Sequence, residues 1–423
     1  MVYRNLALIA LLLAAISAPV MAGGSVFSGN GVGEQLVGGG TRAQGLGGGG
    51  LGLADSMSFN SDNPALSAYS VRTLLRMAGQ VGVWETSANG RKDSDGEFVW
   101  QDFFVYFPVL KSWRMGLGAV PRNHMDLRLF ENRTAIFQDT AHTRSDTVHF
   151  EEQDAWQGSR VDLRFENSVK VSDKLAVGLS TAYILLRNER DRTLALPSVE
   201  ANSYYYGVGY SEIETFRGFS FGLGGYYEAT PKLGLGLVYR PRIPGHWDYT
   251  NSKGGGTTIH RSRSGDAPGE IDFGACYKLS PRFVGVGDVR AGQWAAGDLG
   301  IISDSAGTIT PENPLFVSVG FERMAGKAPA ATGFETWAYR AGLYYRKHYW
   351  PLRNGAAVSD YAVTAGLSVP IAGHAGWLHI AAEGGMRGQD ETKLGAKETF
   401  FRGSLQLEMS ETWFERTKPR IPK

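Results

Sequence analysis

The chain has 423 residues and a formal net charge of +1, so no basic field points to nucleic acid, and no nucleic-acid partner is expected. The length suits one large barrel or roughly two or three soluble domains. The single cysteine, Cys276, excludes an intramolecular disulfide framework and a Cys-x-x-Cys metal site. No run of about 20 apolar residues, which a membrane-spanning helix needs, follows the N-terminus.

Residues 1–22 read as a cleavable secretory signal peptide. Arg4 gives the positive start, residues 6–16 form an apolar core that is too short to span a membrane, and residues 20–22 offer small side chains for cleavage. We therefore expect an exported protein whose mature chain starts near Gly23.

The next stretch, residues 23–69, is predicted to be a compact segment before the first strand. Its glycine-rich part, residues 23–52, has no apolar period and is typical of a flexible linker. A helix start follows, because Asp62 or Asn63 can cap a helix and Pro64 fits the first helical position.

Residues 70–414 alternate with a period of two. In the hairpin at 217–240, which turns at Thr230-Pro231, Phe219, Phe221 and Leu223 share one face, and glycine and serine share the other. In an outer-membrane barrel the large apolar face meets lipid, and the small or polar face lines the lumen. The pattern predicts about fourteen strands, at residues 73–87, 98–108, 113–122, 158–171, 174–187, two within 217–240, 269–278, 282–294, 314–323, 336–349, 360–369, 376–386 and 399–409.

The connections between these strands alternate in length. Short turns follow the even strands and longer polar loops follow the odd ones, as in barrels with short periplasmic turns and long extracellular loops. An open edge in lipid would leave backbone groups unpaired, so the first strand should pair with the last. Residues 415–423 form a basic tail, expected in the periplasm. Aromatic residues near strand ends predict two interfacial girdles, made of Trp84, Trp100, Trp113, Tyr249, Tyr277, Trp294, Trp350 and Trp377. The predicted fold class is therefore an all-β transmembrane antiparallel barrel with an N-terminal hatch segment.

Three stretches carry a family resemblance. They are QGLGGGGLGLAD followed by Asp62-Asn63-Pro64-Ala65-Leu66, the hairpin GFSFGLGGYYEATPKLGLGLVYRPRIPG, and the ending FFRGSLQLEMSETWFERTK. In this order they resemble the FadL-like outer-membrane transport barrels, the family of the long-chain fatty acid transporter, over nearly all of the mature chain. That family usually has Asn-Pro-Ala-Gly-Leu, whereas here Leu66 follows Ala65 directly.

The resemblance implies a fourteen-stranded barrel whose N-terminal segment folds inward as a hatch, and which takes up hydrophobic molecules and releases them sideways through a wall opening. We accordingly expect a passive transporter or binder of small, fatty-acid-like molecules in the outer membrane of a Gram-negative bacterium, gated at Asn63, Pro64 and Ala65. The type IX secretion shuttle barrels are resembled about as well. A shuttle that binds a secreted or membrane protein partner is therefore the alternative.

Two groups of residues are candidates for contact with the ligand. The inward rows carry charges of both signs, which predicts a salt-bridged network that holds the hatch. Among these charges, planar guanidinium groups suit a ligand carboxylate, and the candidates are Arg340, Arg346 and Arg402. The long segments 123–155 and 188–215, read as extracellular loops, would capture the ligand with Phe130, Phe137, Tyr204, Tyr205 and Tyr206.

No catalytic residue, metal or cofactor is expected. Residues 218–222 match G-x-S-x-G, but Ser220 lies inside an alternating strand rather than at a strand-turn-helix elbow. A barrel hydrolase using an inward His379 ranks last. The eight histidines show no zinc spacing such as HExxH, residues 93–96 lack the pattern of an EF-hand loop, and the G-x-G spacing within 47–52 has no strand-helix unit around it.

Overall fold

The computed structural model describes residues 23–411, except 89, 139–144, 196–207, 254–255, 257, 300–301, 305–306, 327–330, 353, 372–375 and 389–394. The expected signal peptide and basic tail lie outside the described residues. None of the described helices is long and apolar enough to cross a membrane. The elements are β1 (Glu34–Gln35), α2 (Thr41–Gln44), η1 (Pro64–Tyr69), β2 (Thr73–Ala88), β3 (Arg91–Pro108), β4 (Trp113–Gln138), β5 (Ser145–Lys170), β6 (Leu175–Ala195), β7 (Val208–Thr230), β8 (Leu233–Arg240), β9 (Ile243–Lys253), β10 (Ile259–Ala267), β11 (Gly269–Lys278), β12 (Phe283–Gln293), η2 (Trp294–Ala296), β13 (Ile302–Asp304), β14 (Gly307–Ile309), β15 (Leu315–Arg323), η3 (Gly333–Thr336), β16 (Ala338–Pro351), β17 (Ala357–Ile371), β18 (Gly376–Arg387) and β19 (Lys397–Glu411).

Fourteen of these strands form a closed antiparallel barrel: β2 to β8, β11, β12 and β15 to β19. Each pairs with its neighbours in the chain, and β19 closes the ring on β2, from Lys397 opposite Ser87 to Glu411 opposite Thr73. The predicted fold class and the predicted closure are confirmed. Closure leaves no edge at the seam, so backbone donors and acceptors there are paired within the protein.

The two faces of the wall follow the predicted alternation. On β7, Phe219, Phe221 and Leu223 are 65%, 47% and 56% exposed, which places them on the outer, lipid-facing surface. The polar row of β5 points inward and is buried, namely Arg160, Asp162, Arg164 and Glu166.

The luminal segment, residues 23–70, fills the inside of this barrel. Its glycine-rich part lies directly on the wall, because glycines face each other across the contact. A Cβ on Gly342 would collide with the backbone of Gly47, and one on Gly236 would collide with the carbonyl oxygen of Leu51. The linker-like interpretation of residues 23–52 is therefore wrong: the glycines permit close backbone packing.

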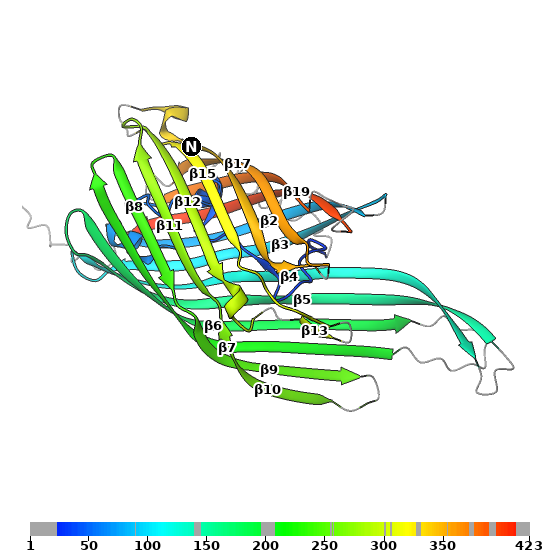
Figure 1. Ribbon diagram of the computed structural model, residues 1–423. Helices are drawn as coiled ribbons and strands as arrows, with labels where there is room; N and C mark the ends of the chain where they lie inside the picture. Colours follow the sequence, from blue (N-terminus) through cyan, green and yellow to red (C-terminus); the bar gives the residue numbers. More distant parts are fainter. Residues whose placement is uncertain are drawn as a thin grey trace, which may run out of the picture.

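Strands β4 to β7 are longer than the roughly 9–11 residues that a bilayer requires. β4 and β5 have 26 residues each, and Figure 1 shows β4 to β7, with β9 and β10, running well past the other strands. The expectation that 123–155 and 188–215 are loops is therefore wrong for their described parts, residues 123–138, 145–155, 188–195 and 208–215, which are strands. The hairpin ladders simply continue outside the membrane, where polar side chains on both faces of a strand remain solvated.

The ladder between β3 and β4 is interrupted. It joins Phe103–Pro108 to Arg114–Ala119, and beyond this β3 stays with β2 while β4 stays with β5. One extra residue bulges from each strand near the break, Gln101 on β3 and Arg122 on β4. Strand β1 of the luminal segment pairs with the free edge of β4. The luminal segment thus supplies a strand where the wall lacks one.

The predicted aromatic girdles are only partly present. Trp100 and Tyr277 are 38% and 48% exposed on the outer face. Trp84, Trp294 and Trp350, however, are fully buried, and the latter two belong to an apolar cluster with residues of the luminal segment. These three side chains point into the lumen, so their place in a girdle was predicted wrongly.

Candidate functional site

Asp62 is the point where the luminal segment is tied to the most strands. Its carboxylate lies 3.0 Å from Arg122 Nη1, 2.7 Å from Arg290 Nη1 and 3.8 Å from Arg164 Nη2. Its carbonyl oxygen accepts a hydrogen bond of 2.8 Å from Arg240 Nη2. These arginines come from β4, β12, β5 and β8, so one residue links four parts of the wall.

The charge state of Asp62 follows from this setting. Burial by itself raises the pKa of the carboxyl, but the surrounding guanidinium groups outweigh it and hold the pKa far below its usual range. Asp62 therefore stays ionised at any physiological pH, and its charge offsets part of the positive charge around it.

Glu34 makes a second anchor at the other end of the luminal segment. Its carboxylate lies 2.7 Å from Arg387 Nη2, 2.7 Å from Arg402 Nη2 and 3.5 Å from Arg346 Nη2. Burial raises the pKa of Glu34, yet the arginines together bring it well below its ordinary value. Two of the predicted ligand-binding arginines, Arg346 and Arg402, are thus engaged in holding the luminal segment.

The third predicted arginine, Arg340, is engaged as well. Its Nη2 lies 3.0 Å from Glu322 Oε1, and its Nη1 donates a hydrogen bond of 2.6 Å to Ser368 Oγ. Glu322 also binds Arg42 of α2 at 3.0 Å. The expected salt-bridged network that holds the segment is present, and it uses the three arginines that the sequence offered as ligand contacts.

A cavity of about 80 Å³ lies between the two anchors, beside residues 35–37 of the luminal segment. Its apolar side is formed chiefly by Leu36, Val37 and Phe316. Its charged side is formed by Arg122, Arg240, Arg290, Arg346, Lys347, Glu270 and Asp272. An apolar wall facing a mostly basic wall suits a ligand with an apolar body and an anionic group.

Some of the guanidinium groups around this cavity have unused donors. Arg122 Nη2, Arg290 Nε and Arg346 Nε are buried and have no hydrogen-bond acceptor. A buried donor without an acceptor is costly, and it marks a place where a further polar group fits. Sequence reasoning missed Arg122 as an inward residue, because a strand bulge reverses the alternation there. It considered Asp62 only as a helix cap.

The predicted gate residues are firmly packed at the end of the barrel that carries the short turns. Asn63 caps η1 by accepting from Ala65 N, and its Nδ2 donates to the carbonyl oxygens of Leu51 and Gly225. Pro64 lies against Gly224, and Ala65 is fully buried in an apolar cluster. The predicted helix start is confirmed, in the form of a 3-10 helix.

Of the side chains predicted to capture the ligand, the structure describes that of Phe130 alone. Phe130 lies on β4 and is 64% exposed. Phe137 also lies within β4, but its side chain is outside what the structure describes. Tyr204, Tyr205 and Tyr206 lie outside the described residues.

A serine-histidine-carboxylate row does exist, although Ser220 is not part of it. His379 Nδ1 contacts Ser368 Oγ, and His379 Nε2 lies 3.1 Å from Glu408 Oε2. Ser368 and His379 are 1% and 2% exposed, and Arg340 donates to the same hydroxyl. A substrate carbonyl therefore has no access to Ser368, and the row serves as a buried packing network.

Comparisons with known proteins agree with this architecture. The family described as BamG matches residues 1–243 and 258–419. Among solved structures, the chain is similar to the CymD monoaromatic hydrocarbon channel (TM-score 0.57), a Pseudomonas aeruginosa FadL homologue (0.58) and the Pseudomonas putida toluene transporter TodX (0.55). Each alignment has 14% identity and covers 90% of this chain and 99% of the other.

A search of curated proteins finds no significant match to the chain. At 14% identity the structural likeness shows the fold, and the family match spans well over half of the sequence. The chain belongs to the BamG family, and its fold is that of the FadL-like outer-membrane barrels.

Proposed function

We propose that this protein is a passive outer-membrane transporter or binder of small hydrophobic molecules that carry an anionic group, as fatty acids do. The ligand would settle in the cavity between the Asp62 and Glu34 anchors. Displacement of the luminal segment around Asn63, Pro64 and Ala65 would then open the path inward. The barrel provides a closed wall and a shaped lumen. The free energy for movement of the ligand comes from its concentration gradient alone.

The observation that carries this proposal is the two-sided lining of the cavity. Val37 and Phe316 give apolar contact, while Arg122, Arg290 and Arg346 each keep a buried N–H without an acceptor. A carboxylate would accept hydrogen bonds from such donors, and charge-assisted bonds of this kind are roughly twice as strong as neutral ones.

The interrupted ladder between β3 and β4 supports a sideways exit. No backbone bonds join these strands beyond Phe103 and Ala119 in the described pairing. The edge of β4 is instead bonded to the luminal segment, through β1 and through Leu36 N donating to the Arg122 carbonyl oxygen. Movement of the luminal segment would therefore free both the cavity and this part of the wall. The hydrocarbon and toluene channels among the structural neighbours are consistent with an apolar cargo.

The test is native mass spectrometry of the barrel released gently from its own membrane, followed by binding measurements. We expect a bound small hydrophobic acid. In binding assays, a fatty acid should bind at least about tenfold more tightly than the alcohol of the same chain length, because only the acid satisfies the free guanidinium donors.

The variant Arg122→Gln should remove most of that preference, whereas Arg217→Gln, which changes an exposed arginine of β7, should retain it. Equal binding of acid and alcohol by the unchanged protein would mean that the arginines do not recognise the ligand. A barrel with no bound small molecule, whose deletion leaves uptake of hydrophobic acids unchanged, would reject transport.

A second candidate is a barrel that binds a protein partner, as a secretion shuttle does. The observation that favours it is the set of long hairpins formed by β4 to β7, which extend past the barrel and offer a broad paired surface (Figure 1). A stoichiometric protein partner without a small ligand, in the same mass spectrum, would select this function over the first.

A further inference from the structure

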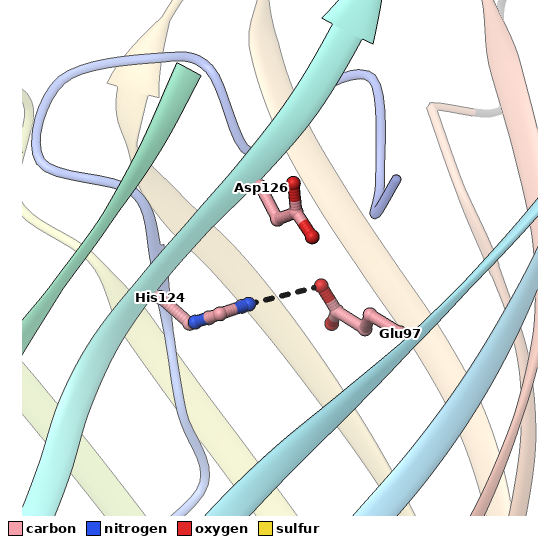
Figure 2. Close-up of side chains that lie close together, drawn as sticks. All are labelled: Glu97, His124 and Asp126. Atoms are coloured by element: carbon pink, nitrogen blue, oxygen red, sulfur yellow. Dashed lines mark ion pairs between the residues drawn. The ribbon is translucent and has the colours of Figure 1, made fainter. Parts of the chain in front are cut away.

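Three side chains converge where β3 and β4 separate. Glu97 reaches from β3, and His124 and Asp126 reach from β4 (Figure 2). One potential ligand atom from each lies within 4.8 Å of the others. His124 Nε2 is 3.2 Å from Glu97 Oε2. The group thus bridges two strands that share no backbone hydrogen bonds at this level.

The closest contact of the group is an ion pair only when His124 is protonated. His124 Nε2 and Glu97 Oε2 are both buried, and neither has a partner in hydrogen-bonding geometry. The Glu97 side chain is only 10% exposed. Buried polar atoms that lie close together without a hydrogen bond have a desolvation cost that no bond offsets. A small cation between them would remove that cost.

The donor set defines the kind of cation. An imidazole nitrogen with two carboxylates suits zinc and its first-row neighbours, whereas calcium and magnesium prefer oxygen ligands and more of them. Bonds of about 2.0 Å to a tetrahedral ion put neighbouring ligand atoms about 3.3 Å apart. His124 and Glu97 already have this separation, and rotation of the Asp126 carboxylate would bring it into range.

No spacing of residues along the chain indicates this site. His124 and Asp126 are two apart on one strand, so their side chains share a face. Glu97 belongs to another strand and meets them only because of the break in the wall. The absence of a zinc motif therefore did not exclude a site assembled by the fold.

We propose that Glu97, His124 and Asp126 bind a divalent transition-metal ion of the zinc class, which links β3 to β4 across the interruption in the wall. The fourth position is left for water. Gly24 N donates to the Asp126 carbonyl oxygen at 2.9 Å, and Glu34 of β1 lies opposite His124 in the strand register. The ion would therefore also steady the start of the luminal segment, and its removal would loosen both.

The experiment uses the full barrel in detergent, purified with a tag that contains no histidine and stripped with a chelator. Zinc is titrated by calorimetry, and cobalt is titrated by its visible spectrum, which reports the coordination number. We expect one saturable ion per barrel. His124→Gln and Asp126→Asn should each weaken zinc binding by at least about tenfold.

A matched control comes from His246, which lies 3.1 Å from Asp248 in an exposed pair outside this group. His246→Gln should bind zinc as the unchanged protein does. The proposal is overturned if no saturable binding occurs below about 1 mM, or if His124→Gln binds normally, or if His246→Gln loses binding equally. Asp126→Asn, which is nearly isosteric, decides the matter should His124→Gln fail to fold.

The linking role has its own readout in hydrogen exchange. Zinc should slow exchange of residues 23–36 in the unchanged protein and have no effect in Asp126→Asn. Binding of zinc without slower exchange there would reject the link between the metal and the wall.

Discussion

The two carboxylates that anchor the luminal segment, Asp62 and Glu34, differ in the charges around them. The arginines at Glu34 also pair with Asp360 or Glu383, at 2.8 to 3.3 Å. At Asp62, by contrast, Arg290 has no other ion pair in the described part of the chain. Loss of the Glu34 charge would leave each of its arginines with another carboxylate partner, whereas loss of the Asp62 charge would leave Arg290 without an ion pair in the described part of the chain.

The anchors also differ in how far they reach. The Asp62 carboxylate joins β4, β5 and β12, and its carbonyl oxygen joins β8, whereas Glu34 joins β16, β18 and β19. The Asp62 anchor therefore fixes the segment across the lumen, and the Glu34 anchor fixes it to one arc of the wall. The comparison teaches that the two ends of the luminal segment are held by separate parts of the wall, so they can be perturbed separately.

Asp62→Ala should have the largest effect. Removing one partner of a buried ion pair costs about 3–5 kcal/mol, because the remaining charge stays buried. We expect the free energy for opening residues 45–70 to fall by this amount in hydrogen exchange. Asp248→Asn, in an exposed pair with His246, is the control and should change nothing. Unchanged exchange in Asp62→Ala would remove the basis of the comparison.

Gly236→Ala tests how closely the wall packs against the glycine-rich part of the luminal segment, which connects the two anchors. The new methyl group would collide with the Leu51 carbonyl oxygen, so about 3 kcal/mol should be lost through overpacking. The measurement is protease cleavage of the luminal segment in the folded barrel. Gly384→Ala is the matched control, since its nearest neighbour would be a Phe401 ring carbon at 3.8 Å. Equal cleavage of both variants would argue against close packing at Gly236.

Glu34→Gln should have a smaller and more local effect. The amide still accepts a hydrogen bond, and each arginine keeps Asp360 or Glu383 as a partner, so a loss of about 1–2 kcal/mol is expected. Hydrogen exchange should accelerate in residues 23–36 and remain slow near Asp62. Faster exchange over the whole segment would show that the two anchors act as one unit.

Acid should have the smallest effect. The pKa values of Asp62 and Glu34 are both lowered in the folded protein, so their stabilising contributions are complete above the ordinary carboxyl pKa. These contributions are lost only as pH falls through the depressed values. Protease protection of the luminal segment should therefore be the same at pH 7 and pH 4. Release of the segment near pH 5 would mean that other groups control its seating.

Much of the fold could be predicted because strands that cross lipid alternate apolar outward residues with small or polar inward residues. The predicted strand 269–278 coincides with β11 (Gly269–Lys278), because its apolar face ends where the bilayer ends. The extensions of β4 to β7 escaped prediction, since strands outside lipid carry polar residues on both faces. Arg387 was missed because the predicted strand 376–386 ends one residue before it.

The site was less accessible to sequence reasoning for a related reason. The arginines predicted from inward alternation do point inward, but alternation does not say which of them lacks a partner. Arg122 sits at a bulge, where the period fails, and Glu97 meets His124 only through the break between β3 and β4. Features of this kind depend on strand register, which no local pattern encodes.

The position of Glu34 also constrains the order of assembly. Its partners Arg387 and Arg402 lie on β18 and β19, which follow the other barrel strands in the chain, and β19 is the strand that closes the ring on β2. A segment enclosed on all sides by the wall would have to be in place as that seam forms. Packing of the luminal segment into the lumen and pairing of β19 with β2 are therefore expected to form one cooperative step, in which each depends on the other.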